Sequence, residues 1–464
     1  MKIKDNRTMK SQLTVMLITC IISFIGCKDF VEVRIPGNQI LGAEVFNNDA
    51  SATSAITGIY SKMMGGSGFA SGGARSLSLI TGMSSDEFIN YNTSYVDYAA
   101  NDLQPTTSML DLYLWNEPYK YIFTANAILE GLAKSNSVSP LVKKQLQGEA
   151  HFIRAFCYFY LVNLFGEIPL QLTTDYKVNA VAYKATVPKV YAQIMVDLKE
   201  AENLLSSDYI TAERVRPNKW TAGALLARTY LYTRDWTNAA SKSLELINQT
   251  SQYTFEQDID KVFLKSTRET IWQMLPVNPS YNTNDGNIFI LTGKPGTSSI
   301  SSTLYTSFDN LDKRKTHWVG SIKVGADQYY YPYKYKVRTG NALTEYAIVF
   351  RLTEQYLIHA EAEVHLEHPD EALKSINKIR YRAGLANLSN QLTGDEILIA
   401  IEKERRVELF SEWGHRWFDL KRTNKANAII GSLKPGTWKE TDVLYPIPQV
   451  EIERNRNIGQ NNGY

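Results

Sequence analysis

Two glutamates near the C-terminus have a spacing that could serve acid–base chemistry. Glu408 and Glu412 lie one helical turn apart, and Arg405 precedes Glu408 by three residues, so the three would share a helix face within pairing reach. The apolar positions Ile397 and Ile401 continue that face, which directs the charges toward the interior. Glycosidase carboxylates instead flank a bond across a cleft, roughly 5 to 9.5 Å apart, and usually come from separate elements. The pattern therefore predicts a structural ion-pair network, and we expect no catalytic site.

Three stretches partly resemble motifs that bind a metal or a cofactor, but none meets the requirements of its motif. His365 and His368 could share a helix face, but they stand at a helix end that is typical of solvated histidines. The glycines between 66 and 72 miss the dinucleotide fingerprint and follow a helix where a strand is required. The stretch 282–286 is like a calcium loop, yet Tyr281 occupies the first ligand position and no glutamate closes it. The sequence thus predicts neither a metal site nor a cofactor.

Aromatic residues in irregular stretches are the candidates for ligand contact. A flat aromatic face beside amide and carboxylate groups suits a sugar ring, which offers CH faces and hydroxyl edges. Trp318 follows the polar run 313–317, in which a core ring is not expected, and Tyr281 lies among asparagines. The full set of candidates is Trp318, Tyr281, Tyr91 and Tyr95. The alternating tyrosines from Tyr329 to Tyr335 predict instead a half-buried, structural strand.

The composition is that of an ordinary globular protein. The chain has 464 residues, of which 44% are apolar and 21% charged, enough to bury a large core. Tyrosine is abundant, with 28 residues against 17 Phe and 8 Trp, and tyrosine suits wet binding surfaces. The formal net charge of +2 gives no electrostatic case for a nucleic acid or an anionic lipid surface as partner.

Helical periodicity recurs along the chain between two loop-rich stretches. The periodic blocks are at about 46–64, 109–135, 140–165, 187–206, 218–250, 346–366, 369–383 and 394–414. The fifth block contains two helices, 220–232 and 236–247, with Asp235 placed as an N-cap and small residues at the crossing, as in a tetratricopeptide hairpin. We predict a mainly α fold: a tetratricopeptide-like helical-repeat scaffold with a large loop-rich subdomain. The insertions at 65–108 and 253–345 are expected to converge on one face and to hold the ligand.

The first 26 residues have the features of an export signal. Four basic residues precede an apolar run, 13–25, which is shorter than the roughly 20 residues of a membrane-spanning helix. A glycine and then Cys27 end the run, as in a bacterial lipoprotein signal. We expect a lipoprotein signal peptide at 1–26, acylation of Cys27 (a palmitate-type anchor), a tether at 27–45 and a single domain at 46–464. An unlipidated secretory signal is the alternative.

Four segments carry motifs of one known family, in that family's order. They are GEAHFIRA with NLFGEIPL (148–170), RLTEQYLIHAEA with NKIRYRAG (351–384), ERRVELF with RWFDLKR (404–422), and YPIP through QNNGY (445–464). With Cys27, they span almost the whole chain and resemble the SusD/RagB family of nutrient-binding outer-membrane lipoproteins. The resemblance implies a protein without catalysis that captures oligosaccharides at the cell surface and delivers them to a SusC-like TonB-dependent transporter. It implies membrane attachment through the N-terminal lipid only.

The resemblance leaves the identity of the ligand open. Peptide capture by the same fold is the first alternative to oligosaccharide capture. A glycan-active hydrolase and a tetratricopeptide adaptor that binds only proteins are the others. Turnover of glycans would reveal the hydrolase, and binding to glycans or to peptides would separate the remaining alternatives.

Overall fold

The computed structural model describes residues 44–65, 69–70, 73–107, 109–278 and 280–464. The predicted signal peptide, Cys27 and the tether up to residue 43 lie outside these residues. Phe46–Tyr464 forms one compact unit. In the part of the chain that the structure describes, no helix is both long and apolar enough to cross a membrane.

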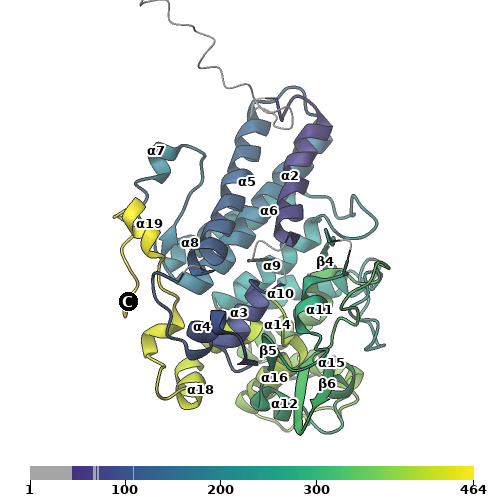
Figure 1. Ribbon diagram of the computed structural model, residues 1–464. Helices are drawn as coiled ribbons and strands as arrows, with labels where there is room; N and C mark the ends of the chain where they lie inside the picture. Colours follow the sequence, from purple (N-terminus) through teal and green to yellow (C-terminus); the bar gives the residue numbers. More distant parts are fainter. Residues whose placement is uncertain (1–43, 66–68, 71–72, 108, 279) are drawn as a thin grey trace, which may run out of the picture. The chain divides into compact units, whose positions relative to one another are not determined.

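A succession of antiparallel helices forms the scaffold. Each helix packs on its neighbour: α5 on α6, α6 on α8, α8 on α9, α9 on α10, α10 on α14, and α14 on both α15 and α16. Figure 1 shows α5 and α6 side by side with α2. This stepwise stacking is the organisation of a helical-repeat protein, so the predicted mainly α, tetratricopeptide-like scaffold is confirmed. The bounds are α2 (Asp49–Met64), α5 (Asn116–Lys134), α6 (Pro140–Phe165), α8 (Val187–Leu204), α9 (Lys219–Tyr232), α10 (Trp236–Ile247), α14 (Leu352–His365), α15 (Pro369–Arg382) and α16 (Gly394–Leu409).

The α9–α10 hairpin follows from its caps and its small residues. The Asn218 side chain accepts a hydrogen bond from the Thr221 backbone amide at 3.0 Å, and Asp235 caps α10 as predicted. These side chains satisfy amides that a helix start leaves without partners. Ala222, Ala224 and Ala227, together with Ala239, are fully buried, which lets the two helices approach closely.

The helix α6 lies at the centre of the scaffold. Its residues from Phe152 to Leu161 are buried on all sides, because α2, α5, α8 and α9 all pack against it. Cys157 is fully buried and free, and it packs as a small core hydrophobe.

Short strands and helices make up the loop-rich subdomain and the remaining connections. Within the described residues, four two-stranded antiparallel sheets pair β1 with β5, β2 with β3, β4 with β8, and β6 with β7. The strands are β1 (Phe88–Asn90), β2 (Ile168–Pro169), β3 (Lys184–Ala185), β4 (Thr270–Met274), β5 (Ser298–Ile300), β6 (Val319–Val324), β7 (Asp327–Pro332) and β8 (Ala347–Arg351). The other helices are α3 (Leu77–Ser84), α4 (Val96–Ala100), α7 (Tyr176–Asn179), α11 (Asn284–Phe289), α12 (Ser302–Ser307), α13 (Lys313–His317), α17 (His415–Arg422), α18 (Ala426–Leu433) and α19 (Gln449–Arg454), with η2 (Thr93–Tyr95), η3 (Leu110–Trp115) and η4 (Glu440–Val443).

Candidate ligand-binding surface

The two loop-rich stretches meet along a pair of short strands. β1 pairs antiparallel with β5, with Phe88 opposite Ile300. Both residues are buried, and the Phe88 ring lies 5.2 Å from the Phe289 ring, centroid to centroid. β5 in turn lies against β7. The core contacts of Phe88 therefore bring residues 65–108 and 253–345 together at this point.

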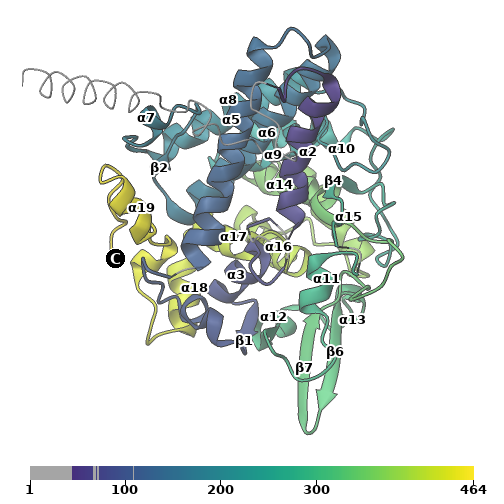
Figure 2. The ribbon, with the colours of Figure 1, turned by 45° about the horizontal axis from the view of Figure 1, so that its top comes forward.

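A β-hairpin carries the alternating tyrosines. β6 and β7 pair in register, with Ser321 opposite Tyr330, and Gly325 in the turn has a φ of 63°, which glycine adopts without strain. Figure 2 shows this hairpin projecting beyond α12. Alternation places Tyr329 and Tyr331 on one face and Tyr330 on the other. The predicted strand is confirmed for Tyr329 and Tyr331, but it ends at Pro332.

Tyr91 contacts the tyrosine face of the hairpin. Its side chain is 37% exposed, and its ring centroid lies 6.0 Å from that of Tyr329 at an interplanar angle of 80°. The hydroxyl oxygens of Tyr91 and Ser299 are 3.2 Å apart. An edge-to-face pair leaves ring faces free, so the candidate Tyr91 and the strand residue Tyr329, one from each loop-rich stretch, present aromatic surface beside hydroxyl groups.

A glycine opposite Tyr331 fixes the position of the next ring. A Cβ atom on Gly320, the cross-strand partner of Tyr331, would lie 2.4 Å from atoms of the Tyr331 ring, so the ring lies directly over the glycine. The Tyr333 ring follows at 5.8 Å, centroid to centroid, and 83°. We call Tyr91, Tyr329, Tyr331 and Tyr333 the aromatic surface. All four are at least partly exposed.

Trp318 lies in the core, and the expectation that its polar context keeps it outside is wrong. The ring is fully buried, its Nε1 donates to the Ile259 carbonyl oxygen at 3.1 Å, and it packs edge-on against Phe263 at 5.4 Å. One of its charged neighbours is inside as well: Arg314 is fully buried and donates to Glu408 at 2.8 Å, whereas Lys313 and Thr316 remain exposed. An enclosed ring has no face left for a sugar.

Tyr95 and Tyr281 have different surroundings. Tyr95 is 4% exposed, and its hydroxyl donates to the Ala74 carbonyl oxygen, so the expectation of a ring available to a ligand is wrong here as well. Tyr281 is partly exposed, but the asparagines beside it are occupied. The Asn282 side chain holds backbone groups of the 342–345 loop, and Asn284 donates to a backbone carbonyl. Among the described residues, Tyr281 makes no ring contact with the aromatic surface.

The opposite face of the hairpin carries a second aromatic group that the sequence did not indicate. Tyr330 stacks on Tyr305 of α12 at 3.7 Å and 18°, and the Lys315 ammonium lies 4.7 Å from the Tyr305 ring centroid. The three residues come from three separate elements, so no spacing along the chain joins them.

The C-terminal glutamates belong to a buried ion-pair network, as predicted. Arg314, Arg351 and Arg382 all pair with Glu408. Burial opposes ionisation of Glu408, but the three guanidinium groups outweigh it and hold its pKa well below the usual range. The expected Arg405–Glu408 pair is absent from the described residues. Arg405 donates to Asp419 instead, at 2.8 Å.

The network leaves the glutamates fully engaged in ion pairs. Glu412 pairs with Lys334 and Arg351, so both carboxylates are held by cations inside the protein. Across the described ranges, no group of three or more His, Cys, Asp or Glu side chains is placed to hold a metal ion.

Comparisons with known proteins agree with this architecture. A family model described as "Starch-binding associating with outer membrane" matches residues 40–231, and one described as "SusD family" matches residues 248–464. SusD-like protein P2 of Formosa agariphila is 27% identical over 97% of this chain and 99% of its own. A SusD superfamily structure from Bacteroides vulgatus has a TM-score of 0.80 at 21% identity, covering 90% of this chain and 99% of the other. A laminarin-binding SusD-like protein has a TM-score of 0.76 at 23% identity, covering 90% and 100%.

The fold and the surface define the class of protein. It is a helical-repeat protein whose inserted, loop-rich subdomain presents exposed tyrosines. The family models and the similar proteins place the chain within that class, and it belongs to the SusD/RagB family.

Proposed function

We propose that this protein captures oligosaccharides at the cell surface and binds them without turnover. The observation that carries the proposal is the aromatic surface, where Tyr91 and Tyr329 come from different loop-rich stretches and lie beside hydroxyl groups. Tyrosine faces stack on the CH faces of sugars, and hydroxyl groups bond to sugar hydroxyls. The starch-binding description of one family model and the laminarin-binding relative support this ligand class.

A ligand screen tests the proposal. The protein without residues 1–26 is heated with laminarin oligosaccharides, starch oligosaccharides, other neutral glycans and a set of mixed peptides. Because a ligand that binds only the folded state adds about 2.7 kcal/mol of stability at 100 times its Kd, at least one glycan should raise the Tm. The same mixtures should show no new reducing ends. A shift with peptides alone would replace the glycan proposal by the peptide alternative, and new reducing ends would replace it by the hydrolase.

We further propose that Cys27 carries the lipid anchor. In this proposal residues 1–26 are the lipoprotein signal, 27–45 the tether, and 46–464 a single domain at the outer face of the outer membrane. The family description "associating with outer membrane" supports the location. The lipid is then the protein's only attachment to the membrane.

Replacement of Cys27 by serine should release the protein from the membrane. A single myristoyl-length chain holds a protein only marginally and two or more hold it firmly, so loss of acylation should move most of the protein to the soluble fraction. Immunoblots of soluble and membrane fractions, with Cys157→Ser as the matched cysteine control, measure this. Wild-type distribution and mobility of Cys27→Ser would exclude lipidation.

The proposed partner is a SusC-like TonB-dependent transporter, since a captured glycan is useful only when it reaches a pore. The protein isolated from outer membranes in mild detergent through a C-terminal affinity tag should carry a large β-barrel protein in a stoichiometric amount. Mass spectrometry of the eluate identifies it. Recovery of the tagged protein alone, from membranes that contain the transporter, contradicts the partnership.

A further inference from the structure

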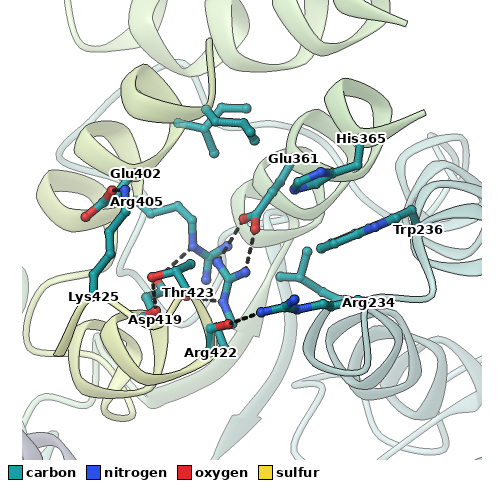
Figure 3. A pocket seen from close by; sticks show the side chains of 13 residues that line it. Arg234, Trp236, Glu361, His365, Glu402, Arg405, Asp419, Arg422, Thr423 and Lys425 are labelled. Atoms are coloured by element: carbon teal, nitrogen blue, oxygen red, sulfur yellow. Dashed lines mark hydrogen bonds and ion pairs between the residues drawn. The ribbon is translucent and has the colours of Figure 1, made fainter. Parts of the chain in front are cut away.

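A pocket of about 260 Å³ lies in the helical scaffold. Trp236 of α10, His365 of α14, Leu398 and Arg405 of α16, and Arg422 of α17 contribute to its wall. Figure 3 shows these elements around it. The pocket shares no residue with the aromatic surface, so its ligand and the proposed glycan are independent.

Arg405 has unused hydrogen-bonding capacity in this pocket. Its side chain is 2% exposed, and its Nε donates to Asp419 at 2.8 Å. Its two terminal amino groups are buried, and neither has a hydrogen-bond partner among the residues that the structure describes. A buried donor without an acceptor is destabilising, and more so when it is charged. The terminal amino groups of Arg405 therefore need a hydrogen-bond acceptor that the described residues do not provide.

The acidic groups around Arg405 are already committed. Asp419 also accepts from the Arg422 Nε at 2.7 Å, and Glu361 accepts from the Arg422 guanidinium at 2.8 Å. Glu402 pairs with Lys425. Four basic and three acidic side chains line the pocket: Arg234, Arg405, Arg422 and Lys425 against Glu361, Glu402 and Asp419. This leaves an excess of one positive charge, which a singly charged anion balances.

The other walls of the pocket suit an apolar group. Leu231, Leu398 and Ile401 line it, and the rings of Trp236 and His365 stack at 3.9 Å and 14°. Figure 3 shows this stacked pair across the pocket from Arg405. Pockets for drug-sized ligands measure about 300–1,000 Å³, so this one suits a smaller molecule.

We propose that this pocket binds a small monocarboxylate with an apolar body. The carboxylate accepts hydrogen bonds from the terminal amino groups of Arg405, a planar pairing that guanidinium and carboxylate favour. The apolar body lies against Leu398 and the Trp236–His365 pair. A phosphate dianion carries more negative charge than the single uncompensated positive charge of the pocket, and the three carboxylates of the wall repel the excess. A monocarboxylate therefore fits better.

Calorimetric titration with 3-phenylpropanoate tests the proposal. Its amide, 3-phenylpropanamide, has the same body without the charge, and inorganic phosphate has charge without the body. The acid should bind, and both other probes should bind at least about tenfold more weakly, since hydrogen bonds between charged groups are the strong ones. The weakest affinity that calorimetry resolves is a Kd of about 10 mM, near 3 kcal/mol. No binding of the acid at that concentration overturns the proposal, and so does equal binding of the amide or of phosphate.

Two variants locate the binding. Arg405→Gln removes the charge but leaves Asp419 paired with Arg422, and it should lower affinity for the acid about tenfold or more. Leu398→Trp fills the pocket without touching an ion pair and should abolish binding, which decides the question if Arg405→Gln unfolds. The exposed Arg338→Gln serves as control and should bind as wild type does. Unchanged affinity in Leu398→Trp places the ligand elsewhere and overturns the assignment.

Discussion

Replacing Glu408 with alanine should lower the free energy of unfolding by about 3–5 kcal/mol, the loss expected when one partner of a buried ion pair is removed. Glu408 is fully buried and is shared by three arginines whose side chains are at most 2% exposed. Without the carboxylate, the three guanidinium groups remain inside and lose a common counter-charge. Urea unfolding followed by far-UV circular dichroism measures the change.

The exposed pair Glu371–Lys374 provides the matched control. Its two side chains are 50% and 70% exposed, and exposed pairs contribute about 0–1 kcal/mol. Glu371→Ala should therefore leave the midpoint almost unchanged. Equal losses in Glu408→Ala and Glu371→Ala would contradict the account of the network.

The loss of unfolding free energy in Glu408→Ala should depend on pH. The pKa of Glu408 is lowered in the folded protein because three guanidinium groups outweigh burial. The carboxylate therefore stabilises the fold above the usual glutamate pKa of about 4.3, and this stability is lost as the pH falls through the lowered folded value. The difference between wild type and Glu408→Ala should be largest above pH 5 and should narrow on acidification.

Local patterns were sufficient to predict the helical scaffold. The apolar stripe of α6, the Asp235 cap and the small residues of the α9–α10 crossing are all features of neighbouring residues. Because a helix is made of contacts three and four residues apart, its signals are written in a short window of sequence. The convergence of the two loop-rich stretches was also expected, although only their composition and length indicated it.

The positions of the individual candidate residues depend on contacts between residues far apart in the chain. A short window of sequence does not contain such contacts. The charged residues before Trp318 suggested an exposed ring, but Arg314 pairs with Glu408, 94 residues later in the chain, and both Arg314 and Trp318 are fully buried. Arg405 was expected to pair with Glu408 on its own helix, whereas Asp419 of α17 takes it. In both cases a partner from another element decided where the side chain lies, and the neighbouring residues in the sequence did not.

The contacts within the aromatic surface could not be predicted from local sequence either. Tyr91 was a candidate, and the structure leaves it exposed. Its neighbour Tyr329 was assigned to a structural strand, which it does form, but an alternating strand has two faces and only packing decides which one solvent reaches. The contact between Tyr91 and Tyr329 therefore required the fold.

Removal of either ring should weaken glycan binding substantially. Stacking of a nucleobase on an aromatic side chain contributes about 1–3 kcal/mol, and by analogy Tyr91→Ala and Tyr329→Ala should each lower affinity roughly 5- to 150-fold. The two rings touch each other, so the double variant should lose less than the sum of the two single losses. Neither ring is in the core, so the Tm should stay close to that of wild type.

Calorimetric titration with the best glycan from the screen is the most direct test of capture at the aromatic surface. Wild type is compared with Tyr91→Ala, Tyr329→Ala, the double variant, and Tyr176→Ala on α7. Tyr176, 73% exposed, is the control for loss of an exposed tyrosine. We expect wild-type affinity for Tyr176→Ala and a loss of about fivefold or more for each of the others, with all variants folded. Wild-type affinity in the folded double variant would place the glycan elsewhere and contradict capture at the aromatic surface.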